Sequence, residues 1–242
     1  MLLRRAAIFQ YCGGNSLRTI TSTIACGAAF LGMMFAWADG STAQARSWSA
    51  NFVARVEALA LIETLNSELL SNSSATLTLE HWCDVHHLAS PPHIKAVRVP
   101  GVDKPVSPEQ RQELRVTPTE PVRYRRVRLE CGSVVLSEAD NWYVPSRLTP
   151  EMNTLLDSTD MPFGRAVQPL HFQRRTLSSK LLWQPLPEGW EINAARPDAA
   201  DIPMPANLLE HRAVLSLPDG TPFSEVVESY TANVLGFPVP HR

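Results

Sequence analysis

Hydrophobic and polar positions alternate along this chain with two different periods. In residues 47–70 the apolar residues recur every three or four positions, and they are Phe52, Val56, Leu59, Ile62, Leu65 and Leu69. This spacing predicts a helix with one apolar face. The polar run 71–74 ends that helix and offers Ser74 as the cap of a second one over residues 75–88.

The rest of the chain is dominated by strand patterns. Residues 94–99 alternate like a strand, and two hairpins are predicted, 123–130 with 134–144 and 210–217 with 221–234. Two more strands are expected within 170–184, separated near 177–179, and short helical segments near 109–114, 149–157 and 161–165. This order indicates an α+β fold, a single antiparallel sheet with helices packed on one face.

The strand 123–130 carries an arginine where a core residue is expected. Alternate residues of a strand share one face, so Arg125 lies on the same side as Val127 and Leu129. A buried guanidinium is costly unless an anion meets it. Two interpretations stay open: a structural ion pair with a glutamate of the core, or a site for the carboxylate of a ligand.

The composition limits the class of protein that this chain can be. The chain has 242 residues with 44% hydrophobic content and a net charge of −2, enough for one globular domain with a full core. We assign that domain to residues 46–242, with a proline-rich surface insertion at 185–205. The near-neutral charge argues against a nucleic-acid partner. We expect a monomer.

The first 45 residues have the pattern of an export leader. Arg4, Arg5 and Arg18 precede an uncharged run over 19–38, and small residues at 36–38 and 43–45 fit cleavage sites. This predicts a signal peptide and an exported or periplasmic protein that contacts a membrane only through the leader. An uncleaved anchor is one alternative. A start at Met33 or Met34 is another, and it would leave the protein in the cytoplasm.

Two cysteines, Cys83 and Cys131, lie beyond the leader. They could form a disulfide after export, but we favour two separate buried thiols. Cys83 also lies among His81, His86 and His87, a spacing that suits zinc. Only two of these side chains share a helix face, so we favour a polar helix face over a metal site.

Five segments together resemble the chorismate lyase (chorismate–pyruvate lyase) superfamily. They are Tyr124–Glu130 before a Cys-Gly turn, Tyr143–Leu148, Met161–Arg165, Asp219–Pro222 leading into a strand with two glutamates, and Leu70–Thr76. The resemblance covers roughly residues 65–234. It implies an internal ligand cavity and an enzyme that eliminates pyruvate from chorismate to give 4-hydroxybenzoate for ubiquinone biosynthesis. No metal or organic cofactor is implied.

The resemblance also implies site residues. Arg125 matches the arginine that binds a substrate carboxylate, and Glu228 matches the active-site glutamate, with Glu225 as the ungapped alternative. Ala75, Phe163 and Gly164 fall at ligand-contacting positions. Glu225 and Glu228 are three apart on a strand, so they point to opposite faces and only one can meet Arg125.

The chemistry fits these residue types. An arginine donates two parallel hydrogen bonds to a carboxylate, and a glutamate in an apolar cavity has a raised pKa suited to proton transfer. Arg174, Arg175 and Arg212 are candidates for a second carboxylate, although a solvated basic face is the favoured interpretation. Two further hypotheses remain beside the lyase: an exported, non-catalytic binding protein for a small aromatic carboxylic acid, and a purely structural envelope protein.

Overall fold

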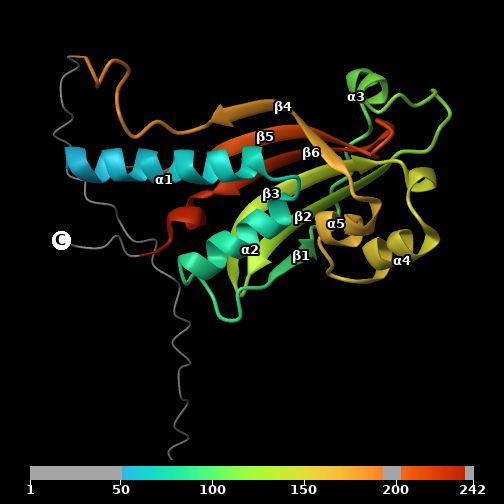
Figure 1. The fold of residues 1–242 in the computed structure, drawn as a ribbon, viewed down its shortest axis with the longest axis horizontal. Helices are drawn as coiled ribbons and strands as arrows, with labels where there is room; N and C mark the ends of the chain where they lie inside the picture. The colour runs from blue at the N-terminus through green and yellow to red at the C-terminus, as the bar shows by residue number, and fades with distance from the viewer. Residues whose placement is uncertain (1–50, 193–202, 238–242) are drawn as a thin grey trace, which may run out of the picture. The chain divides into compact units, whose positions relative to one another are not determined.

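The computed structural model describes residues 51–192 and 203–237. These residues form one antiparallel sheet of six strands in the order β1-β2-β3-β6-β5-β4, with helices packed on it (Figure 1). The strands are β1 (Ile94–Arg98), β2 (Arg123–Cys131), β3 (Val134–Tyr143), β4 (Gln173–Leu181), β5 (Asn207–Ser216) and β6 (Pro222–Thr231). The helices are α1 (Phe52–Ser71), α2 (Ala75–Val85), α3 (Pro108–Glu113), α4 (Pro150–Ser158) and α5 (Phe163–Ala166). The predicted α+β class is confirmed.

Helices α1 and α2 form where the sequence predicts them. The apolar stripe of α1 buries Ile62, Leu65 and Leu69 in the main core. The Ser74 hydroxyl accepts a hydrogen bond from the Leu77 amide, so Ser74 is the N-cap of α2. The cap fixes where α2 begins, and this matters because the start of α2 borders the internal cavity described below.

The β2–β3 hairpin pairs Arg125 with Asn141 and Val127 with Ala139, all on the face that α1 and α2 cover. Gly132 occupies its turn with a φ of 58°, and an added Cβ there would lie 2.8 Å from the Cβ of Ala89. Both the backbone conformation and the lack of space therefore require glycine at this position.

Two predictions about the sheet are wrong in detail. Residues 170–184 hold one strand, β4, because a register shift between Thr176 and Ser178 absorbs the interruption that suggested two strands. The helices are not confined to one face. Helix α3 packs against β6 on the opposite face, where Leu114, Trp142 and Val144 form a small separate core.

Cys83 and Cys131 form a disulfide between α2 and β2, with their Cα atoms 6.6 Å apart. The prediction of two separate thiols is therefore wrong. Hydrophobic spacing alone could not show that the end of β2 lies under α2. The bond also removes Cys83 as a metal ligand, and no group of side chains able to hold a metal ion occurs within residues 51–192 and 203–237.

The predicted leader lies outside the described residues, as does the middle of the 185–205 insertion. At the near end of that insertion, Leu186 is buried. In the part of the chain that the structure covers, no helix is both long and apolar enough to cross a membrane. The export and location of the protein stay predictions.

Candidate functional site

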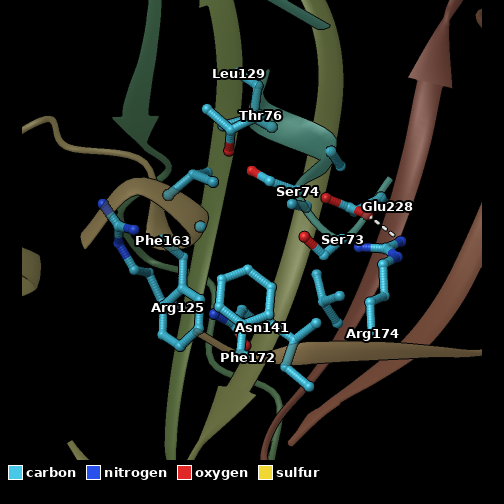
Figure 2. A pocket seen from close by; sticks show the side chains of 16 residues that line it. Ser73, Ser74, Thr76, Arg125, Leu129, Asn141, Phe163, Phe172, Arg174 and Glu228 are labelled. Atoms are coloured by element: carbon cyan, nitrogen blue, oxygen red, sulfur yellow. Dashed lines mark hydrogen bonds and ion pairs between the residues drawn. The ribbon is translucent and has the colours of Figure 1, made fainter. Parts of the chain in front are cut away.

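An internal cavity lies between the helix-covered face of the sheet, the start of α2, and the segment that carries α5 and β4. Its volume is about 40 Å³. Phe163, Phe172, Leu215 and Val226 supply apolar walls, and the polar lining includes side chains of β2, β3, β4 and β6. Figure 2 shows that these side chains point toward a common space from elements far apart in the sequence.

Five of the six predicted site residues line this one cavity: Arg125, Glu228, Ala75, Phe163 and Gly164. They come from β2, β6, α2 and α5, so the fold brings together four segments that the sequence leaves far apart. Gly164 lies against the start of α2, where an added Cβ would be 3.1 Å from the Ser74 hydroxyl oxygen.

Glu225, the sixth residue, does not reach the cavity. It is fully buried on the opposite face, where Arg212 Nε donates to its carboxylate at 2.8 Å and Gln110 donates at 3.2 Å. The structure therefore settles which glutamate faces the cavity, and the expectation that the two point to opposite faces is confirmed. It also gives Arg212 a structural partner in place of a ligand carboxylate.

Glu228 is held by two neighbours. Arg174 Nη2 donates to its carboxylate at 2.7 Å, and the Tyr230 hydroxyl donates at 3.2 Å. The Arg174 side chain is only 5% exposed, so the interpretation of Arg174 as part of a solvated basic face is wrong. That interpretation holds for Arg175, whose side chain is 63% exposed and pairs with Glu113. Strand alternation in β4 was the signal that could have separated the two arginines.

Arg125 is 6% exposed, and no carboxylate of the described residues forms an ion pair with it. Its Nη2 donates to the Met161 carbonyl at 3.1 Å, while Nε and Nη1 have no acceptor among the described residues. Burial and the nearby Arg98 lower the pKa of Arg125 to about 10. The structural ion pair considered from the sequence is therefore absent here, and a buried cation is left with unused donors.

The unpaired buried atoms that line the cavity are all N–H donors. They are Nε and Nη1 of Arg125, Nδ2 of Asn141 and Nε of Arg174. The carbonyl oxygen of Asn141 accepts a hydrogen bond from the Ser224 hydroxyl, and its amide nitrogen has no acceptor among the described residues. Sequence reasoning missed Asn141, although its pairing opposite Arg125 in the hairpin could have indicated it.

His211 lies opposite Glu228 in the sheet and is fully buried. Its Nε2 is 2.8 Å from Asn66 Oδ1 and 3.1 Å from Ser179 Oγ. Burial, together with the positive charge of Arg174, lowers the pKa of His211 to about 4. The ring is therefore neutral in the folded protein at neutral pH.

This burial predicts a loss of stability in acid. The unfolded state takes up a proton on His211 near pH 6.5 and the folded state only near pH 4, so stability falls as pH drops through that window. His211→Gln should remove roughly 3 kcal/mol of that pH dependence. Urea denaturation of both proteins at pH 7 and pH 4.5 measures it. The exposed His81, replaced in the same way, is the control, and equal pH slopes for all three proteins would contradict the prediction.

These features define an α+β domain, one antiparallel sheet with helices packed on it, that holds an internal, donor-rich cavity. The chain is 53% identical over 236 residues to the uncharacterized protein y4mC of Sinorhizobium fredii (strain NBRC 101917 / NGR234), covering 96% of this chain and 98% of the relative. The chain belongs to the family of that protein. No protein-family model matches the chain.

Solved structures with a similar fold include PhnF from Mycobacterium smegmatis, at 14% identity and TM-score 0.44, covering 70% of this chain and 69% of that one. The effector domain of the same PhnF gives a TM-score of 0.42 at 14% identity and coverages of 66% and 88%. A GntR-family transcriptional regulator from Enterococcus faecalis V583 gives 0.36 at 17% identity and coverages of 61% and 99%. This likeness concerns the fold alone.

The predicted chorismate lyase, which would release pyruvate and form 4-hydroxybenzoate for ubiquinone biosynthesis, is wrong. The structures of similar fold are transcriptional regulators and their effector domains, not lyases. The site agrees with this correction, because Glu228 is engaged by Arg174 and Tyr230 and the cavity is far smaller than the ~300 Å³ at which ordinary small-molecule pockets begin. No finding supports the predicted signal peptide. We also predicted that the protein has no nucleic-acid partner and that it is a monomer, and both stay predictions.

Proposed function

We propose that this domain binds a small carboxylate-bearing molecule in the internal cavity and does not transform it. The observation that carries this proposal is the excess of donors: Arg125, Asn141 and Arg174 line one cavity, and each has a buried N–H group without an acceptor among the described residues. A buried donor without an acceptor costs ~1–3 kcal/mol. A carboxylate, which has only acceptor oxygens, is the ligand group that relieves this cost.

The walls indicate what the rest of the ligand is. Phe163 and Phe172 flank the cavity, and Phe163 also contacts Tyr143 and Phe223 through ring–ring packing. A flat aromatic body can stack against such rings. We therefore favour a small aromatic acid such as benzoate as the ligand class.

The small volume makes binding depend on movement. A cavity of about 40 Å³ has room for a few water molecules and not for an aromatic ring in its present shape. Entry of a ring requires a neighbouring side chain to shift, and Phe163 on the short helix α5 is the best placed, since it is only partly buried. Ligand binding would then displace α5, which gives a binding domain a way to report occupancy.

Calorimetric titration of the full chain with benzoate tests this proposal. We expect binding that Arg125→Met weakens by at least about tenfold, because a lost charge-assisted hydrogen bond is worth ~1.5–3 kcal/mol. Arg128→Met is the matched control, since Arg128 lies on the same strand but on the opposite face, where it pairs with Glu130. Benzyl alcohol has the same ring without the carboxylate and should bind far more weakly. Equal affinity of benzoate for both variants, or of both compounds for the protein, would refute a carboxylate site.

A further inference from the structure

A second hollow lies on the outer side of β2, where the neighbouring strand β1 ends. Its volume is about 550 Å³, and residues 98–102 and 123–126 form most of its lining, together with Tyr143 and Asp157. We call it the β2-edge groove. Unlike the internal cavity, it has room for a small molecule without any movement of side chains.

Arginines dominate the charge of the β2-edge groove. Arg98, Arg123 and Arg125 line it, and Asp157 is the one acidic residue in its lining. Asp157 lies 2.9 Å from Arg123 and 3.9 Å from Arg98, so a single carboxylate serves two guanidinium groups. Three positive charges against one negative charge leave the groove with a surplus of two.

Arg126 also lines the groove but does not add to this surplus. Its guanidinium lies 2.7 Å from the Glu138 carboxylate and 3.3 Å from the Asp140 carboxylate, both on the neighbouring strand β3. Two carboxylates already balance it. The surplus therefore belongs to the three arginines that Asp157 alone opposes.

The guanidinium of Arg125 belongs to the β2-edge groove as much as to the cavity. After burial, the groups that shift the pKa of Arg125 are Arg98, which lowers it, and Tyr143 and Asp157, which raise it, and all three line the groove. Figure 2 shows Arg125 on the side of the cavity opposite to Arg174 and Glu228. Its unpaired Nε and Nη1 are thus donors of a residue that is only 6% exposed and borders the groove.

The backbone of β2 contributes a further donor. The Val99 amide donates to the Arg126 carbonyl, and β1 ends at Arg98, so no strand of the sheet pairs with β2 on this side before residue 126. Hydrogen-bonding direction alternates along a strand, which turns the Tyr124 amide toward the same side as that of Arg126. The Tyr124 N–H therefore faces the groove.

We propose that the β2-edge groove binds a dianionic oxyanion of the phosphate type. The surplus of two positive charges matches such a group, and guanidinium forks donate pairs of hydrogen bonds to its oxygens. The arginines are positioned in advance: Arg98 donates to the Leu156 carbonyl near the end of α4, and Arg123 donates to Asp157. Holding the donors in place before binding lowers the cost of binding.

This site goes beyond the proposed function and does not depend on it. The cavity requires Asn141 and Arg174, whereas the groove requires Arg98 and Arg123, and only Arg125 borders both. Variants of Arg98 and Arg123 should therefore leave benzoate binding unchanged. If the unaltered protein binds phosphate but not benzoate, the proposed ligand of the cavity is wrong and the proposal for the groove stands.

Calorimetric titration of the full chain with inorganic phosphate at low salt tests whether the groove binds this anion. We expect binding that Arg123→Gln and Arg98→Gln each weaken by about five- to tenfold, since each removes one charge–charge contact. Asp157→Asn should tighten binding, because it removes the carboxylate that competes with the anion. Arg128→Gln, also on β2 but paired with Glu130, is the matched control and should bind like the unaltered protein.

Comparison of anions completes the test. Sulfate, also a dianion, should compete with phosphate, whereas acetate should bind at least about tenfold more weakly because it carries half the charge. The proposal fails if the unaltered protein binds no phosphate, or if acetate binds as tightly as phosphate. It also fails if Arg123→Gln and Arg128→Gln have equal affinities for phosphate.

Discussion

Replacing Arg174 with methionine is expected to lower the free energy of unfolding by about 3–5 kcal/mol, because it leaves a buried carboxylate without its cation. Arg174 Nη2 lies 2.7 Å from Glu228, and both side chains are more than nine-tenths buried. Methionine fills much of the same volume, so the change tests the charge rather than the packing. Urea denaturation monitored by circular dichroism measures the difference.

Two further variants make this result specific. Arg175→Met changes the next residue of β4, whose side chain is largely exposed, and should cost less than about 1 kcal/mol. The double variant Arg174→Met with Glu228→Gln should recover much of the loss, since it removes the stranded charge. A single Arg174→Met variant as stable as the Arg175→Met control would show that the pair is not buried in solution.

Loss of the disulfide should cost about 4 kcal/mol in the chain-entropy estimate for a closed loop of this length. Cys83 and Cys131 are 48 positions apart, and both are fully buried in the main core. Serine in place of Cys83 keeps the size of the side chain but leaves the two segments free to separate in the unfolded state. Guanidinium denaturation of the unaltered protein and of Cys83→Ser measures this cost.

A reducing agent provides the internal control for that measurement. Reduction should destabilise the unaltered protein toward the level of the variant and leave Cys83→Ser itself almost unchanged. If reductant shifts both proteins equally, or neither, the bond does not stabilise the folded protein as proposed.

Local patterns were sufficient for most of the fold. The helical stripe of α1, the Ser74 cap of α2 and the Thr149–Pro150 start of α4 depend on neighbours a few residues away, and each lies where it was expected. Strand alternation likewise put Arg125 on the buried face of β2. The prediction of two strands within residues 170–184 was wrong because β4 pairs with β5, a strand distant in the sequence. That pairing accommodates a bulge, which interrupts the local alternation of side chains without ending the strand.

The candidate site was likewise predictable in part from the sequence, and the rest of it depends on the assembled sheet. The resemblance supplied five residues that line one cavity, but it could not show that Glu228 is already paired with Arg174. That pairing depends on β4 and β6 lying on either side of β5, an order that only the assembled sheet reveals. The same holds for the β2-edge groove, which exists because β1 stops short of Arg123 while α4 delivers Asp157 from another part of the chain.

By itself, the sequence determined the α+β class, the main helices and hairpins, and the presence of an arginine on the buried face of β2. These follow from side-chain periodicity and from the cost of burying charge, both of which act over short stretches. Only the tertiary structure decided which charges meet: Glu228 with Arg174, Glu225 with Arg212, and Arg125 with no carboxylate of the described residues. Electrostatic contacts depend on distances between segments far apart in the chain, and those distances are set by the packed sheet.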